Sequence, residues 1–256
     1  MNEMTTTNRP QLRLAILLAL CGALATLAVL PYLFAMQPAL AARIPLPLPV
    51  FALVQFAQGG ALLLLLGWIG LRCGREIGLD APFARALAYR SAMPAFVPRT
   101  WLVACVTGLL AGGLIRVLDL GFQAYLPPAA APSAETIAFW KRALASLYGG
   151  ITEELMCRLF LMALVVWAAW KLSGRRHAPG VGLVLLGVVV AALVFGLLHL
   201  PATAQVWPLT PVVVSRAILL NAIGGIAFGI LYWRYGLEHA MAAHLFADIA
   251  LHVIGS

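Results

Sequence analysis

The sequence predicts an all-α fold, namely a polytopic transmembrane helix bundle of about seven spans. Of the 256 residues, 63% are hydrophobic and only 10% are charged, which is too apolar for a soluble domain of this length. Apolar stretches long enough to cross a bilayer recur along the chain. Lys and Arg gather in the short segments between these stretches, so the net charge of +8 indicates membrane orientation. We expect the lipid bilayer as a partner and no nucleic acid.

A window of about 19 residues separates the apolar stretches from one another. About seven spans are expected, within a range of six to eight, and either the segment 72–99 or the segment 134–149 could hold an extra partial crossing. The expected spans lie near residues 12–36, 48–71, 100–122, 150–170, 181–200, 211–233 and 237–254.

Two of these elements carry additional signals. In the first span, Pro31 predicts a kink or an early end of the helix, and the small residues at 39–42 leave a cleaved signal peptide as an alternative. The segment 134–149 has apolar residues on one side at helical spacing and charged residues elsewhere. It is therefore expected to form an amphipathic interfacial helix before the first motif helix.

The basic residues also predict the orientation of the chain. With the N-terminus inside, the outer segments carry only Arg43, Lys141 and Arg142. This asymmetry favours a cytoplasmic N-terminus and, with seven spans, a C-terminus on the other side. The inner segments carry Arg9, Arg13, Arg72, Arg75, Arg85, Arg90, Arg99, Lys171, Arg175, Arg176 and Arg234.

Three charged residues stand in the apolar fourth span: Glu153, Glu154 and Arg158. Each charge near the centre of a bilayer costs about 2.5–3.5 kcal/mol, so such charges face a protein interior or a cavity. Glu154 and Arg158 are four apart and can pair on one helix face. Glu153 points about 100° away and is left to face a cavity. The structural alternative is an interfacial cluster at a helix start, with Thr152 as N-cap.

Later spans contribute three more polar residues. His199 ends an apolar run just before Pro201, and a histidine there could also be merely interfacial. His244 and Asp248 are four apart in the last span and form one polar stripe. An inward-facing site and a packing hydrogen bond between helices both remain open for this pair.

The motifs EExxxR at Glu153–Arg158, FxxxH at Phe195–His199 and HxxxD at His244–Asp248 follow one another in order. Together with the glycine-rich run from Gly225 to Gly236 they resemble the CPBP family of CAAX-processing and bacteriocin-processing intramembrane endopeptidases, also called the ABI family and related to the type II CAAX prenyl protease. The resemblance covers roughly residues 100–254. It implies two parts: N-terminal transmembrane helices with a cytoplasmic loop over 1–99, and a catalytic helix bundle over 100–256.

The resemblance also implies catalytic roles. Glu153 with His199 would activate the hydrolytic water, His244 with Asp248 would stabilise the oxyanion, and Glu154 with Arg158 would support the site. One position departs from the family, which commonly has Asn where this chain has Asp248. An ionised carboxylate repels an oxyanion, so Asp248 must be protonated or must orient His244 as a hydrogen-bond acceptor. The second role is the one expected here.

The cofactor is left open between none and a divalent metal such as zinc. The chain lacks HExxH, yet two histidines and two carboxylates could form a mixed site. The candidate metal ligands are Glu153, His199, His244 and Asp248.

The predicted function is hydrolysis of a peptide bond in a membrane-associated peptide or protein substrate. The alternatives are a proton-coupled transporter and a non-catalytic membrane scaffold of the same fold. The Ala-, Leu- and Arg-rich composition indicates a bacterial inner-membrane protein, and no residue names the substrate.

Overall fold

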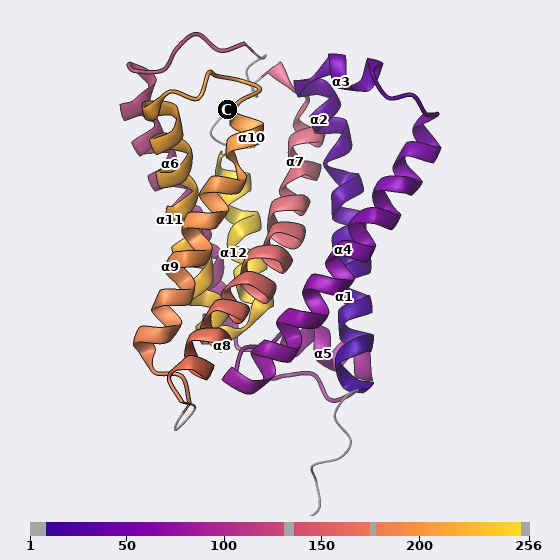
Figure 1. The fold of residues 1–256 in the computed structure, drawn as a ribbon, viewed down its shortest axis with the longest axis vertical. Coiled ribbons are helices and arrows are strands. Elements are labelled where there is room, and N and C mark those ends of the chain that lie inside the picture. Colours follow the sequence, from indigo (N-terminus) through magenta and orange to yellow (C-terminus); the bar gives the residue numbers. More distant parts are fainter. Residues whose placement is uncertain (1–8, 131–135, 175–177, 252–256) are drawn as a thin grey trace, which may run out of the picture.

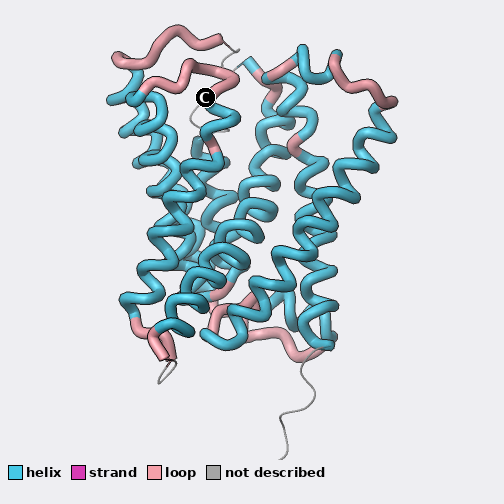
Figure 2. Tube along the Cα trace, in the orientation of Figure 1, coloured by secondary structure: helices cyan, strands magenta, loops and turns pink. Residues whose placement is uncertain are grey.

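The computed structural model describes residues 9–130, 136–174 and 178–251, and within these ranges it contains helices and loops but no strand. The helices run side by side and the loops lie at the two ends of the bundle (Figures 1 and 2). In chain order the elements are α1 (Arg9–Ala28), α2 (Leu30–Met36), α3 (Pro38–Ala42), α4 (Leu48–Ile77), α5 (Pro82–Tyr89), α6 (Pro98–Gln123), α7 (Phe139–Leu147), the π-helical η2 (Tyr148–Glu153) and η3 (Leu155–Met162), α8 (Ala163–Leu172), α9 (Val181–Leu198), α10 (Leu200–Thr203), α11 (Pro211–Tyr235) and α12 (Leu237–Ile249).

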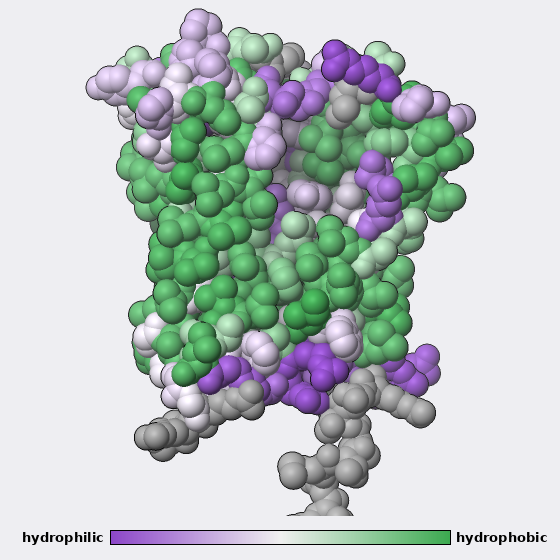
Figure 3. Space-filling model, in the orientation of Figure 1, coloured by the Kyte–Doolittle hydropathy of each residue, from purple (hydrophilic) through white to green (hydrophobic). Residues whose placement is uncertain are grey.

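The prediction of an all-helical membrane bundle is confirmed. Six helical stretches among the described residues are long and apolar enough to cross a bilayer, and α12, with 13 residues, adds a shorter seventh helix. Green apolar side chains cover most of the face drawn in Figure 3, and polar side chains gather at its two ends. The six long stretches are Gln11–Met36, Leu48–Ile77, Pro98–Gln123, Phe139–Leu172, Val181–Thr203 and Pro211–Tyr235.

Two sequence expectations about helix ends are met. The first span is interrupted at Val29, two residues before Pro31, as expected from the missing N–H of proline. The amphipathic segment expected over 134–149, before the motif helix, is helical from Phe139. Tyr148 keeps right-handed helical dihedrals, so α7 runs directly into the motif helix. The helix continues through Gly149 and Gly150 as the π-helical η2.

Pairs of helices pack closely where small residues allow it. The most extensive pairs are α1 with α4, α9 with α11 and α6 with α12. The spacing of Gly225 and Gly229 predicts close helix approach. In the structure, a Cβ added to Gly225 would lie 2.7 Å from the Cβ of Ala192 on α9. The absence of a side chain at Gly225 therefore lets α11 approach α9.

The loop before α5 holds the start of α12. The backbone N–H of Leu237 donates to the carbonyl oxygen of Asp80 (3.1 Å). The Glu238 carboxylate accepts from the N–H of Ala84 (2.8 Å) in the first turn of α5. The segment 72–99 thus contains the end of α4, the short α5 and a loop, and no extra crossing. Its contacts fix the helix that carries His244.

Candidate active site

A cavity of about 870 Å³ opens within the bundle and contains the polar residues that the motifs single out. Side chains from α2, α6, α7, α9, α11 and α12 line it. Figure 3 shows the molecular surface hollowed in its upper half, between the positions of α10 and α2 in Figure 1. Glu153, His199, His244 and Asp248 all line this cavity.

Glu153 lies between the two histidines. Its Oε1 is 3.9 Å from Nε2 of His199, and its Oε2 is 3.7 Å from Nε2 of His244. The carboxylate is about one-fifth exposed, to the cavity that it lines. Both separations are longer than a hydrogen bond and leave space for a small reactant between the groups.

The second ring nitrogen of His199 fixes the orientation of the ring. Nδ1 lies 2.8 Å from the carbonyl oxygen of Phe195. A carbonyl only accepts hydrogen bonds, so Nδ1 must be the donor. The neutral imidazole then keeps its lone pair on Nε2, which is the atom that faces Glu153. His199 can accept a hydrogen bond from a water at this place.

Glu154 is fully buried and serves two partners at once. Its Oε1 lies 2.9 Å from Nη1 of Arg158 and 2.7 Å from Nδ1 of His244. The first contact is the ion pair that the i,i+4 spacing predicts. The second joins residues that are 90 positions apart, and it orients the ring of His244. In the structure, the acceptor that orients His244 is therefore Glu154.

Aromatic rings enclose the cations of this site. The guanidinium carbon of Arg158 lies 4.8 Å from the ring centre of Phe195 and 5.3 Å from that of Phe228. Phe228 also stacks on His244, with 4.6 Å between ring centres. Cation–π contacts partly replace the water that a buried guanidinium gives up. The two phenylalanines hold Arg158 and His244 in place while excluding solvent.

Asp248 stands on the far side of His244. Its Oδ1 is 3.7 Å from Nε2 of the histidine, which is too long for a hydrogen bond. The carboxylate thus faces the same reactive nitrogen as Glu153 does. His252, four residues after Asp248 in the sequence, lies outside the described residues.

Gly149 is part of the site, although it belongs to none of the three sequence motifs. A Cβ at this position would collide with Oδ2 of Asp248 and would lie 3.0 Å from Nε2 of His244. The absence of a side chain lets η2 approach α12 and brings Glu153 near His244. The pair Gly149–Gly150, which ends three residues before Glu153, is the sequence signal that could have indicated this close approach.

The motif helix is wound as π-helix over η2 and η3. Such segments are rare and occur frequently at functional sites. A π-turn widens the helix and changes which residues share a face. Here Glu153, which ends η2, faces the cavity, while Glu154 between the two segments is enclosed.

The described residues contain no group of three or more His, Cys, Asp or Glu side chains arranged to hold a metal ion. The candidate donors Glu153, His199, His244 and Asp248 share a cavity, with 3.7–3.9 Å between neighbouring donor atoms. The mechanism proposed for the site uses the protein's own groups.

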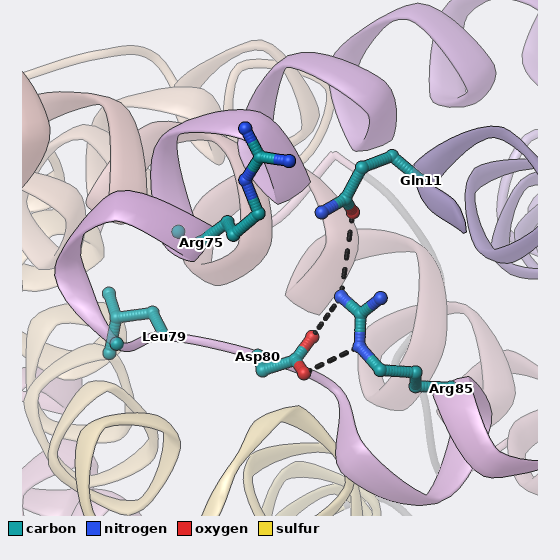
Figure 4. Close-up of a pocket in the computed structure, with 7 residues that line it drawn as sticks. Gln11, Arg75, Leu79, Asp80 and Arg85 are labelled. Carbon is teal, nitrogen blue, oxygen red and sulfur yellow. Dashed lines mark hydrogen bonds and ion pairs between the residues drawn. The ribbon is translucent and has the colours of Figure 1, made fainter. Parts of the chain in front are cut away.

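A second cavity, of about 450 Å³, lies at the end of the bundle where α4 finishes. Figure 4 shows Arg85 facing Asp80, with Gln11 and Arg75 around them. The Arg85 Nε donates to Asp80 Oδ2 at 2.6 Å, and this hydrogen bond raises the pKa of the guanidinium above its usual value. None of the motif residues lines this cavity. It belongs to the contacts that hold α5 in place.

Comparison with known proteins gives one match. Residues 135–250 match a family model described as type II CAAX prenyl endopeptidase Rce1-like. No curated protein and no solved structure matches the chain. The matched residues include all three motifs and most of the cavity lining.

Proposed function

We propose that the chain is an intramembrane endopeptidase that cleaves a membrane-associated peptide or protein with a water activated by Glu153, because residues 135–250 match the model of the Rce1-like, type II CAAX prenyl endopeptidase family. The family is one of proteases, and the helices make this chain an integral membrane protein. The observation that carries the proposal is the position of the Glu153 carboxylate, 3.9 Å and 3.7 Å from the Nε2 atoms of two histidines in one cavity.

The first step uses Glu153 and His199. A water held between them donates one proton to the Glu153 carboxylate and a hydrogen bond to the lone pair of His199 Nε2. The oxygen then attacks the carbonyl carbon of the substrate, and the carbonyl oxygen becomes an oxyanion. General bases of this kind raise the rate of hydrolysis roughly 10²–10⁴-fold.

The second step uses His244. In its imidazolium form the ring donates from Nδ1 to Glu154 and from Nε2 to the oxyanion, which lowers the free energy of the tetrahedral intermediate. A protonated Asp248 donates a further hydrogen bond from the other side. The C–N bond then breaks, Glu153 returns its proton to the leaving amine, and the new carboxyl product departs.

The test is hydrolysis in reconstituted membranes. The purified protein in proteoliposomes receives a fluorogenic farnesylated peptide that ends in a CAAX sequence, and the same peptide without the farnesyl group. We expect cleavage by the wild type and none by Glu153→Gln. Product masses identify the cleaved bond, and the zinc content of the active preparation checks for a metal. Cleavage of equal rate by both proteins would remove Glu153 from the mechanism.

The alternatives receive no support from the structure. A transporter or a scaffold would not need one carboxylate placed between two histidines, although either could share the helical bundle. If the wild type hydrolyses no peptide, Glu153→Ala is expressed in the native host and the peptides bound to it are identified. Bound peptides would indicate a narrow substrate range, and their absence would indicate a non-catalytic protein. We place the protein in a bacterial inner membrane with its N-terminus in the cytoplasm, as the loop charges indicate.

A further inference from the structure

The active-site cavity opens near one end of the bundle, which is called the open end here. Met36 on α2 and Ala202 on α10 both line the cavity, and these two helices lie at the upper end in Figure 1. His199 belongs to the same end, because it follows Val181 by 18 residues and precedes Thr203 by only four in its span. In Figure 3 the hollow lies on the side of the bundle and is flanked by apolar side chains. A ligand therefore reaches the cavity from the lipid or the water at this end.

The bundle is tightly packed between the catalytic residues and the opposite, closed end. Leu159 and Val166 follow Glu154 on the same helix and are buried. A Cβ added to Gly70 of α4 would collide with the carbonyl oxygen of Leu159, and one added to Gly187 of α9 would collide with the Val166 side chain. Two neighbouring helices thus pack directly against the motif helix at this level. This close packing separates the cavity from the closed end.

Basic side chains gather at the closed end. They lie in the first turns of α1 and α6, in and just after α5, and in the last turns of α4, α8 and α11. Outside the cavity lining, the described residues of the open end carry only Arg43 and Lys141. Loops enriched in Lys and Arg stay in the cytoplasm, so the charges predict that the cavity opens away from the cytoplasm. The basic residues of the closed end are Arg13, Arg72, Arg75, Arg85, Arg90, Arg99, Lys171 and Arg234.

From this arrangement we propose, resting on the hydrolysis proposed above, that the active site receives its substrate from the non-cytoplasmic side of the membrane. The substrate is a membrane-anchored protein whose scissile segment has already crossed the bilayer, and it enters between α2 and α10. A translocation step must precede cleavage, because a segment left in the cytoplasm would meet the packed end. Entry from the side suits an anchored chain, since its apolar anchor stays in lipid while the polar backbone of the scissile segment reaches polar partners in the cavity.

The first test measures hydrolysis on each side of the membrane. Right-side-out and inverted vesicles are prepared from cells that produce the full chain. A fluorogenic farnesylated peptide with a sulfonated dye, which cannot cross the bilayer, is added outside. Intact right-side-out vesicles should show nearly all of the hydrolysis measured after permeabilisation with detergent, and intact inverted vesicles should show almost none. Vesicles with Glu153→Gln give the background from other peptidases. Hydrolysis confined to intact inverted vesicles would overturn the proposed side and leave the peptidase intact.

The second test blocks the cavity with a label. Ala202 is exposed and lines the cavity, so Ala202→Cys is made in a chain whose four native cysteines are replaced. A bulky, membrane-impermeant maleimide should label this cysteine in right-side-out vesicles and abolish hydrolysis relative to the same variant before labelling. Ser173→Cys, which follows α8 at the closed end, is the matched control. It should be labelled in inverted vesicles, and its hydrolysis after permeabilisation should not change.

Labelling also separates this proposal from the proposed hydrolysis, because it needs no substrate. Labelling of Ala202→Cys in right-side-out vesicles, without hydrolysis in any vesicle even after permeabilisation, would contradict the peptidase and support a cavity open to the non-cytoplasmic side. Labelling of Ala202→Cys only in inverted vesicles would overturn the proposed side, whether or not the protein hydrolyses the peptide. Labelling of Ala202→Cys and Ser173→Cys from the same side would overturn it as well.

Discussion

Glu153 and Glu154 are adjacent in sequence yet have different partners. Glu154 is enclosed with Arg158 and His244, whereas Glu153 reaches the cavity. The Glu154–Arg158 pair could be predicted because four residues separate them on one helix. The contact of Glu154 with His244 could not, because only the packing of α12 against η2 brings positions 154 and 244 together.

At Glu153, the change to glutamine should reduce peptide hydrolysis by about 10²–10⁴-fold, as for the loss of a general base. The melting temperature should stay near that of the wild type, because the carboxylate makes no hydrogen bond within the described residues that the change would break. Glu76→Gln, at the far end of α4 with Lys171, is the control and should retain activity. A large drop in melting temperature for Glu153→Gln would make this glutamate structural.

At Glu154, the change to glutamine should mainly destabilise the protein. It leaves the buried Arg158 without its countercharge, a loss of about 3–5 kcal/mol for a buried pair, and it weakens the hydrogen bond that orients His244. Thermal unfolding in detergent and the yield of folded protein measure the effect. Normal folding together with complete inactivity would mean that the catalytic and supporting roles of the two glutamates are reversed.

At Asp248, the change to asparagine should retain activity or raise it. The carboxyl group lies 3.7 Å from the reactive nitrogen of His244, and an amide, which is neutral at every pH, can replace the protonated carboxyl group as donor to the oxyanion. Asp248→Ala should lose activity, since it can neither donate nor accept. Cleavage rates and zinc content are measured for both variants. An inactive Asp248→Asn that has also lost bound zinc would instead make Asp248 a metal ligand.

At the scale of elements, the site depends on how closely η2 approaches α12. The sequence predicted a helix over 150–170 and polar residues on one face, but a regular α-helical period cannot reveal the two π-helical segments. Spacing rules depend on a fixed number of residues per turn, and π-turns change that number.

Gly149→Ala tests the approach of η2 to α12. The added methyl group would collide with the Asp248 carboxylate and press on His244, so we expect a loss of activity and roughly 1–3 kcal/mol of stability, as for overpacking. Gly113→Ala on α6 is the control, because a Cβ there meets no atom within 4 Å. Hydrolysis and thermal unfolding are compared for both. Wild-type activity in Gly149→Ala would show that the two elements can separate without cost.

At the scale of the whole molecule, hydropathy predicted the number and positions of the spans well. Long apolar segments are stable in few environments other than a membrane, so transmembrane helices can be recognised from sequence. The last expected span, 237–254, is α-helical to Ile249 and π-helical at 250–251, and its remaining residues lie outside the described ranges. The division at residue 99 stays a prediction.

The orientation of the bundle can be tested with single cysteines in a background without the four native ones. Ser173→Cys follows α8, and Tyr125→Cys follows α6 at the opposite end, near α10. Basic residues are in excess around position 173, so a membrane-impermeant maleimide should label Ser173→Cys only in inverted vesicles. Tyr125→Cys should be labelled in right-side-out vesicles. The reverse pattern would place the N-terminus outside.

The sharing of Glu154 by Arg158 and His244 has a consequence for descendants of this protein that abandon hydrolysis. Such a chain could replace Glu153 freely, because few contacts of the bundle depend on it. It could not replace Glu154 without also rebuilding the interior around Arg158. A glutamate at position 154 in such a sequence therefore indicates only that the helical bundle is folded. Under the proposed mechanism, a glutamate at position 153 would distinguish active peptidases from inactive proteins of the same fold, and this chain has a glutamate there.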